Sequence, residues 1–153
     1  MKYMVGDILA NVKNGIIVHG CNAQGVMGGG IALQVKQMYP QSYACYVNGL
    51  KRMEEADKNP MGKVFFNRES KDLYVANAIT QDKFGRNKRH VDYEAVAKAF
   101  ERIRYVATNL SGEMVPIHYP LIGAGLAGGN WNIIQCIIEE TLSGLDHTCW
   151  TLN

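Results

Sequence analysis

The stretch between Ile16 and Val35, IIVHGCNAQGVMGGGIALQV, constrains the fold of this 153-residue chain more than any other. Its first residues, Ile16 to Val18, have the apolar, β-branched composition of a buried strand. The run stops at small and polar residues, His19, Gly20, Cys21 and Asn22. The sequence therefore predicts a strand that delivers His19 and Asn22 to its carboxyl edge.

A glycine-rich loop follows this strand and leads into a helix. Gly25 and the triplet Gly28, Gly29 and Gly30 precede residues 31–36, which have helical periodicity. Successive glycines let backbone N–H groups approach an anion, and a helix start adds unpaired donors with about half a positive charge. Alternatively, the glycines only relieve strain in a turn. We expect an anion site, because three adjacent glycines are costly to order without a ligand or close packing.

Length and composition limit the class of protein. A chain of this length fits one domain over residues 1–153, and 47% hydrophobic with 20% charged residues is typical of a globular protein. The net charge of +2 is too weak to indicate nucleic acid by itself, so that partner is not expected but stays open. No apolar run approaches about 18 residues and no signal peptide is evident. We expect a cytoplasmic protein with no membrane partner.

The cysteines give no indication of a metal centre. Cys21, Cys45, Cys136 and Cys149 form no CxxC pair and have no histidine at zinc-finger spacing. They are expected to be free thiols in a reducing compartment, and we expect neither a metal nor a cofactor.

Strands and helices alternate along the rest of the chain. Strand patterns occupy 64–66, 73–76, 114–122 and 147–152, and helical patterns begin near 41 and after Asp92 and Asn130, both of which can cap a helix. This alternation predicts an α/β sheet covered on both faces. Near the N-terminus, Asp7 follows Gly6 after a short extended stretch. It is either a turn or cap residue, or an acceptor for an exocyclic amine.

A second glycine loop, residues 123–129, also lies between a strand and a helix. It matches GxGxxG at Gly123, Gly125 and Gly128, but only 25 residues follow (153 minus 128), too few for the further βαβ repeats of a dinucleotide-binding oxidoreductase. Loops at the carboxyl ends of neighbouring parallel strands meet at one crevice, where a ligand with two linked phosphates could be held.

A basic segment, residues 83–90, contains Lys83, Arg86, Lys88, Arg89 and His90 with Phe84 among them. It is either a solvated surface loop, or a rim that attracts a phosphate and lays Phe84 on a base or sugar.

Four separated motifs resemble those of the macrodomain family, which binds ADP-ribose. They are GDI at 6–8, HGCN at 19–22, GGGIA at 28–32 and PLIGAGLAGG at 120–129, in the family's order over nearly the whole chain. The resemblance implies a three-layer α/β/α fold with a mixed central sheet. It is greatest to the small stand-alone ADP-ribose-1''-phosphate phosphatases of yeast and phages.

The resemblance also implies roles for individual residues. Asp7 would accept the adenine amine and Ile8 would contact adenine through its backbone. Asn22 would bind the distal ribose. The remaining ligand contacts would come from the two loops and from Gln81, namely Gly28, Gly29, Gly30, Ile31, Gln81, Gly123, Ala124, Gly125, Leu126 and Ala127.

Two departures bear on activity. Macrodomains that remove ADP-ribose with a lysine nucleophile carry that lysine after an Ile-Thr pair and an Asp after GxGL. Here Gln81 and Ala127 stand at those positions, which makes that mechanism doubtful. Many macrodomains read NAAN where this chain has HGCN, so His19 introduces a titratable group near Asn22.

The resulting hypothesis is a phosphoric monoester hydrolase that converts ADP-ribose-1''-phosphate to ADP-ribose and phosphate, with His19 and Asn22 as catalytic residues. A histidine that titrates near neutrality can act as general acid or base; a hydrogen-bonded structural histidine is the alternative. Two other functions remain open: a non-catalytic module that binds ADP-ribose, and an ADP-ribosylhydrolase acting on protein or nucleic acid.

Overall fold

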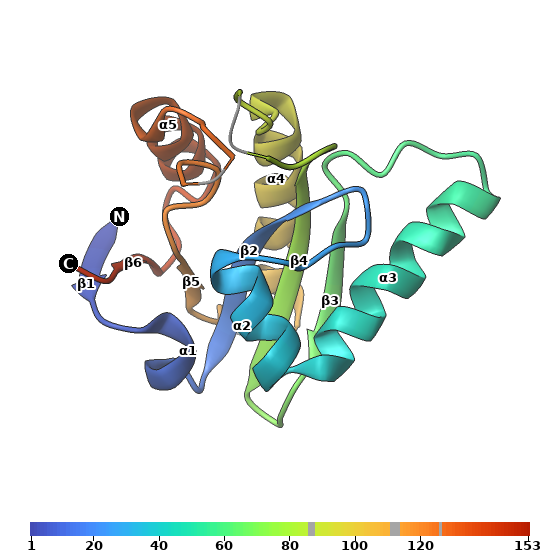
Figure 1. Cartoon of the computed structure of the whole chain (residues 1–153). Helices are drawn as coiled ribbons and strands as arrows, with labels where there is room; N and C mark the ends of the chain where they lie inside the picture. Colours follow the sequence, from blue (N-terminus) through green and yellow to red (C-terminus); the bar gives the residue numbers. More distant parts are fainter. Residues whose placement is uncertain (86–87, 111–113, 126) are drawn as a thin grey trace.

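The computed structural model describes residues 1–85, 88–110, 114–125 and 127–153. Its strands form one sheet in the order β1-β6-β5-β2-β4-β3, in which only β3 runs antiparallel to its neighbour (Figure 1). The strands are β1 (Lys2–Val5), β2 (Gly15–Asn22), β3 (Val64–Arg68), β4 (Leu73–Gln81), β5 (Ile117–Tyr119) and β6 (His147–Thr151). The predicted mixed α/β sheet is confirmed.

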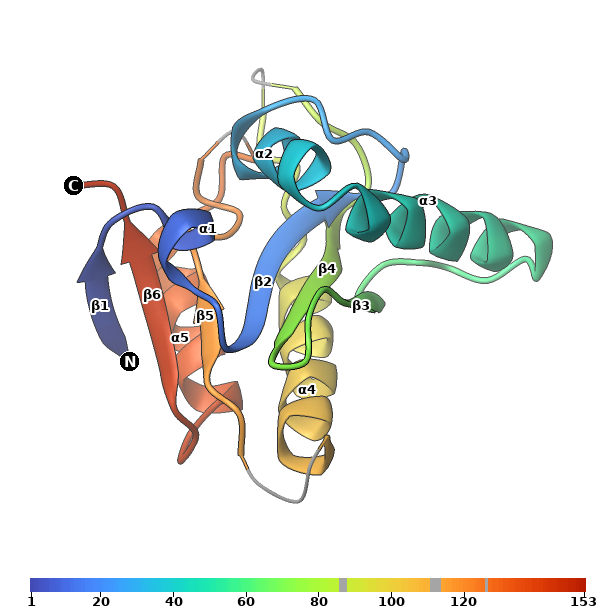
Figure 2. The ribbon, with the colours of Figure 1, turned by 90° about the horizontal axis from the view of Figure 1, so that it is seen from below.

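Helices cover both faces of this sheet, as the two views in Figures 1 and 2 show. They are α1 (Ile8–Asn11), α2 (Gly30–Met38), α3 (Pro40–Glu55), α4 (Tyr93–Asn109) and α5 (Trp131–Thr141). Along β2, Ile16 and Val18 pack with α4 and α5, whereas Ile17 and Cys21 pack with α1, α2 and α3. Alternate residues of one strand thus contribute to two apolar cores, which gives the predicted three layers.

Local sequence signals explain several element ends. Asp92 accepts a hydrogen bond from Ala95 N and caps α4, and Asn130 accepts one from Asn132 N and caps α5. Pro40 begins α3 directly after α2 ends. These capping side chains satisfy donors that the first helical turn leaves unpaired.

Several elements differ from the sequence prediction. β3 and β4 extend past the expected 64–66 and 73–76, to Arg68 and Gln81. β5 is shorter than the expected 114–122, because Pro116 and Pro120 flank it and neither has an N–H to donate to a neighbouring strand. Residues 8–11 form the short helix α1, which was not expected, and Asp7 caps it.

Within the described ranges, none of the helices is long and apolar enough to cross a lipid bilayer.

Candidate functional site

A pocket of about 530 Å³ lies at the carboxyl edge of β2 and β4, between the two glycine loops. This volume is within the range of roughly 300–1,000 Å³ that small-molecule sites occupy. Among the residues predicted to contact a ligand, those that line it are Asn22, Gly28, Gly29, Gly30, Ile31, Gln81, Gly123, Gly125 and Ala127. The fold therefore brings both loops to one crevice.

Other predicted residues do not line this pocket. Asp7 caps α1, where its carboxylate accepts a hydrogen bond of 3.0 Å from Leu9 N, and Ile8 is buried in the core. Ala124 belongs to the second loop but is not part of the pocket wall. Leu126 lies outside the described residues. The adenine contacts expected of Asp7 and Ile8 stay predictions.

His19 is buried completely beneath the site. Its Nε2 lies 2.7 Å from Asn77 Oδ1, and the Cys21 sulfur lies 3.6 Å from the same nitrogen. Burial lowers the pKa of His19 from 6.5 to about 4, although the Asn77 hydrogen bond opposes this shift. The imidazole is therefore neutral at physiological pH, and Cys21, not His19, reaches the pocket wall. This geometry favours the structural alternative over acid–base catalysis.

Asn22 does line the pocket and is 8% exposed. Its Oδ1 accepts hydrogen bonds from Gln24 N at 3.0 Å and from Tyr46 OH at 2.8 Å, while its Nδ2 donates to Val26 O at 2.8 Å. A shift in register between β2 and β4 occurs at Cys21 and Asn22. Such an irregularity re-aims the side chain at the end of a strand.

The first glycine loop lines the pocket with three consecutive glycines, Gly28, Gly29 and Gly30. Gly29 precedes α2 as its N-cap and has no capping side chain, and Gly30 has a positive φ of 56°. Within the described residues, no hydrogen bond uses the N–H of Gly28, Gly29 or Gly30. These N–H groups can therefore bind an anion or a ligand oxygen.

The second glycine loop is closely packed. A Cβ on Gly123 would lie 2.7 Å from Val91 Cγ2, and one on Gly129 would lie 2.5 Å from Gly123 O. Backbone bonds from His90 N and Val91 N to Ala127 O attach the loop to the end of the basic segment. These contacts with neighbouring parts of the fold hold the described residues of the loop in place.

Several wall residues were not predicted to contact a ligand, although most of them lie within the quoted motifs. They are mostly apolar or glycine and come from the ends of strands and from loops, namely Gly20, Val26, Ala32, Gly85, Pro120, Leu121 and Ile122. Phe84 also lines the pocket and is 54% exposed, as expected for an aromatic rim. Arg86 of the same basic segment lies outside the described residues.

The pocket wall is almost free of titratable groups. Of its described residues only Cys21 carries one, and burial raises the pKa of that thiol, which keeps it protonated. The described residues also include no group of three or more His, Cys, Asp or Glu side chains that could hold a metal ion. Neutral donors and apolar surface, rather than side-chain charge, define this site.

A three-layer α/β/α sandwich with a pocket between two glycine loops defines a class of small-molecule-binding domain. Within that class, the chain belongs to the Macro domain family, which it matches over residues 18–138.

Two proteins and one solved structure are similar to this chain over most of its length. It is 25% identical to the ADP-ribose 1''-phosphate phosphatase of the yeast Meyerozyma guilliermondii, over 92% of this chain and 93% of that protein. It is 30% identical to an uncharacterised 17.5 kDa protein of phage T4, over 95% and 92% of the two chains. A solved macrodomain protein from Streptomyces coelicolor superposes with a TM-score of 0.80 at 31% identity, covering 97% of each chain.

Proposed function

We propose that this macrodomain binds ADP-ribose and hydrolyses ADP-ribose-1''-phosphate to ADP-ribose and inorganic phosphate. The observation that carries the proposal is the neutral pocket between the two glycine loops, where the N–H groups of Gly28, Gly29 and Gly30 have no partner among the described residues. The similarity in sequence and length to a yeast protein named for this activity supports it.

The proposed ligand matches the pocket in chemistry. Its diphosphate would accept hydrogen bonds from the backbone of the two loops, where no carboxylate of the described wall repels it. The distal ribose would lie near Asn22, and Phe84 would pack on a flat or apolar surface of the ligand. Gln81, at the end of β4, would add a neutral polar contact.

The reaction needs little from acid–base side chains. Water attacks phosphorus, the bond between phosphorus and the 1'' oxygen breaks, and that oxygen leaves with a proton as part of ADP-ribose. The transition state of phosphoryl transfer is loose in most analyses, so catalysis depends mainly on positioning and on stabilising charge on the phosphoryl oxygens. Fixed backbone N–H groups can do both.

The neutral wall also favours a second candidate, a module that binds ADP-ribose without chemistry. It uses the same contacts and requires no proton transfer. All four cysteines are free, which supports our expectation of a reducing, cytoplasmic setting for either function.

The test measures phosphate release from ADP-ribose-1''-phosphate beside calorimetric titration with ADP-ribose. We expect both in the wild-type protein. In Asn22→Ala we expect no phosphate release and an ADP-ribose affinity that is weaker but still measurable. Binding without release would favour the binding module or hydrolysis of ADP-ribosylated macromolecules. Absence of both would contradict the proposal.

A second variant separates the two roles considered for His19. In His19→Gln the new amide can still hydrogen-bond to Asn77, but it cannot titrate. A structural His19 predicts that the folded variant still releases phosphate. If release is lost while ADP-ribose binding survives, His19 transfers a proton in the reaction.

A further inference from the structure

The loop from Asn22 to Val26 is held by a side chain from another element. Tyr46 of α3 is completely buried, and its hydroxyl lies 2.6 Å from Asn22 O and 2.8 Å from Asn22 Oδ1. The same hydroxyl accepts a hydrogen bond of 3.1 Å from Gly25 N. One phenol thus contacts both the end of β2 and the start of the first glycine loop.

These contacts determine which way the Asn22 amide faces. The backbone N–H groups of Gln24 and Val26, at 3.0 and 3.4 Å, can only donate, so the atom they approach must be the carbonyl oxygen of the side chain. The single O–H of Tyr46 is shared between this oxygen, at 2.8 Å, and the backbone oxygen of Asn22, at 2.6 Å. The nitrogen of the same amide, Nδ2, donates one N–H to Val26 O, which is its only acceptor among the described residues. Its second N–H has no partner in the part of the chain that the structure describes.

We propose that Tyr46 is a positioning residue that fixes the Asn22 amide so that the side chain offers the pocket an N–H donor. The carbonyl oxygen of Asn22 is occupied by protein donors and is not available to a ligand. Asn22 therefore selects an acceptor oxygen. On the proposed function, on which this inference rests, that acceptor is an oxygen of the distal ribose.

The state of Tyr46 suits this role. Burial raises the pKa of its hydroxyl, which therefore remains protonated and remains a donor at any pH the protein experiences.

Neighbouring Tyr43 provides a natural control. It lies on the same helix, and its hydroxyl contacts Gly25 O only at 3.4 Å, without contacting Asn22. Its ring instead faces Lys36, whose Nζ lies 4.5 Å from the ring centre.

The experiment is a double-mutant cycle for ADP-ribose affinity, measured by calorimetry on the full chain. We expect Tyr46→Phe to weaken binding about three- to tenfold, the effect of one net hydrogen bond. In an Asn22→Ala background the same change should have almost no further effect, because the group that Tyr46 positions is gone. Tyr43→Phe should bind as the wild type does.

A merely structural role for Tyr46 gives a different result. Loosening of α3 would weaken binding equally in both backgrounds, and that additivity would overturn the proposal.

If Tyr46→Phe does not fold, Asn22→Asp takes its place. The aspartate keeps an acceptor for Tyr46, Gln24 and Val26 but has no N–H, so it should lose ADP-ribose binding. Undiminished binding by folded Asn22→Asp contradicts the proposal.

Failure of the proposed function is recognised separately. If the wild-type chain does not bind ADP-ribose, the proposed function fails, and amide hydrogen exchange of the free protein then tests Tyr46. Exchange at Gly25 N and of the Asn22 side-chain amide should accelerate in Tyr46→Phe and not in Tyr43→Phe. Unchanged exchange at both would show that Tyr46 does not fix this loop.

Discussion

At the residue scale, buried polar side chains near the site are satisfied to different degrees. Ser42 Oγ donates to Glu69 Oε1 at 2.6 Å, and Asn77 bonds to His19 and to Phe65 O. Thr80 Oγ1, at the end of β4, is buried and has no hydrogen-bond partner within the described part of the chain. A buried hydroxyl without a partner loses its hydrogen bonds to water on folding and gains no replacement, which lowers stability.

Thr80→Val should therefore raise stability. Valine has nearly the same shape and removes the unpaired hydroxyl, so we expect a gain of about 1 kcal/mol in the free energy of unfolding. Denaturant titration measures it. Thr80→Ser keeps the hydroxyl and should show no gain. A lower midpoint in Thr80→Val would mean that the hydroxyl is paired in solution.

At the element scale, the two glycine loops use glycine for different reasons. Gly123 has a positive φ of 74°, and its missing Cβ leaves room for Val91 and Ile134. A Cβ on Gly125 would find no described atom within 4 Å apart from its chain neighbours. Both residues line the pocket. The loop thus contains one glycine required by the fold and one that leaves space in the pocket.

Alanine at these two positions should separate stability from binding. Gly123→Ala should lower the free energy of unfolding by roughly 1–3 kcal/mol, because of backbone strain and a close contact with Val91. Gly125→Ala should change stability by less than about 0.5 kcal/mol. It should nevertheless weaken ADP-ribose binding, because the methyl group narrows the pocket. Thermal unfolding and calorimetry measure the pair. Equal stability losses would contradict this division.

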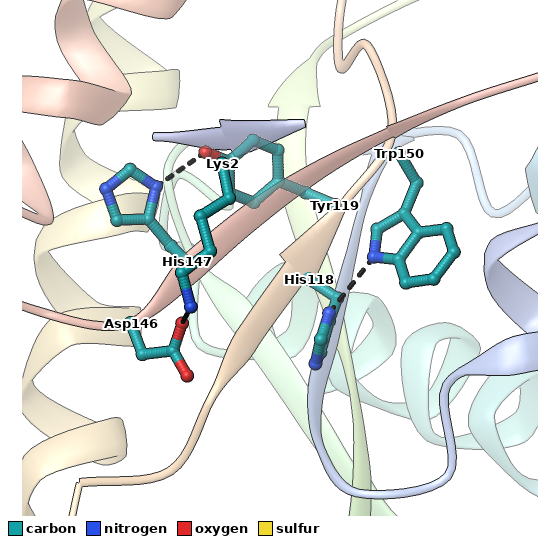
Figure 3. A network of polar contacts seen from close by, with 6 residues as sticks. All are labelled: Lys2, His118, Tyr119, Asp146, His147 and Trp150. Carbon is teal, nitrogen blue, oxygen red and sulfur yellow. Dashed lines mark hydrogen bonds and ion pairs between the residues drawn. The ribbon is translucent and has the colours of Figure 1, made fainter. Parts of the chain in front are cut away.

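At the scale of the whole molecule, neutral histidines form hydrogen bonds between neighbouring strands of the sheet. In the network of Figure 3, His118 Nδ1 accepts a hydrogen bond of 3.0 Å from Trp150 Nε1, and His147 Nδ1 lies 2.7 Å from Tyr119 OH. Burial is the main cause that lowers the pKa of both. Together with His19 of β2, three histidines thus favour the neutral form in the folded state.

This arrangement predicts loss of stability in acid. A histidine whose pKa is lower in the folded state binds a proton more readily when unfolded, so stability falls as pH decreases below about 6.5. The folded pKa of His19 is about 4, so its contribution lowers the free energy of unfolding by about 3 kcal/mol when the pH has fallen to about 4. Denaturant titrations between pH 7 and 4 measure it. His19→Gln should flatten this dependence, and an unchanged slope in that variant would contradict the pKa shift of His19.

Much of the fold could be predicted from the sequence, because the relevant signals are local. The run Ile16–Val18, the glycine triplet and the helical pattern after it specified β2, the first loop and α2. Asp92 and Asn130 begin α4 and α5 as expected, since a cap depends only on the first turn of its own helix. The order of the motifs also sufficed to recognise the family.

Tertiary structure decided the direction in which the polar residues of HGCN point. Side chains alternate along β2, so His19 faces the core beneath α2 and α3 with Ile17, and the register shift at Asn22 takes that residue into the pocket. The helical pattern that begins near residue 41 includes Tyr46, but nothing in the sequence indicates its contact with Asn22, which is 24 residues away. The sequence by itself determined the elements and their order through short-range periodicity and capping. Which side chains meet at the site depends on contacts between elements, and these exist only once the sheet and helices have packed.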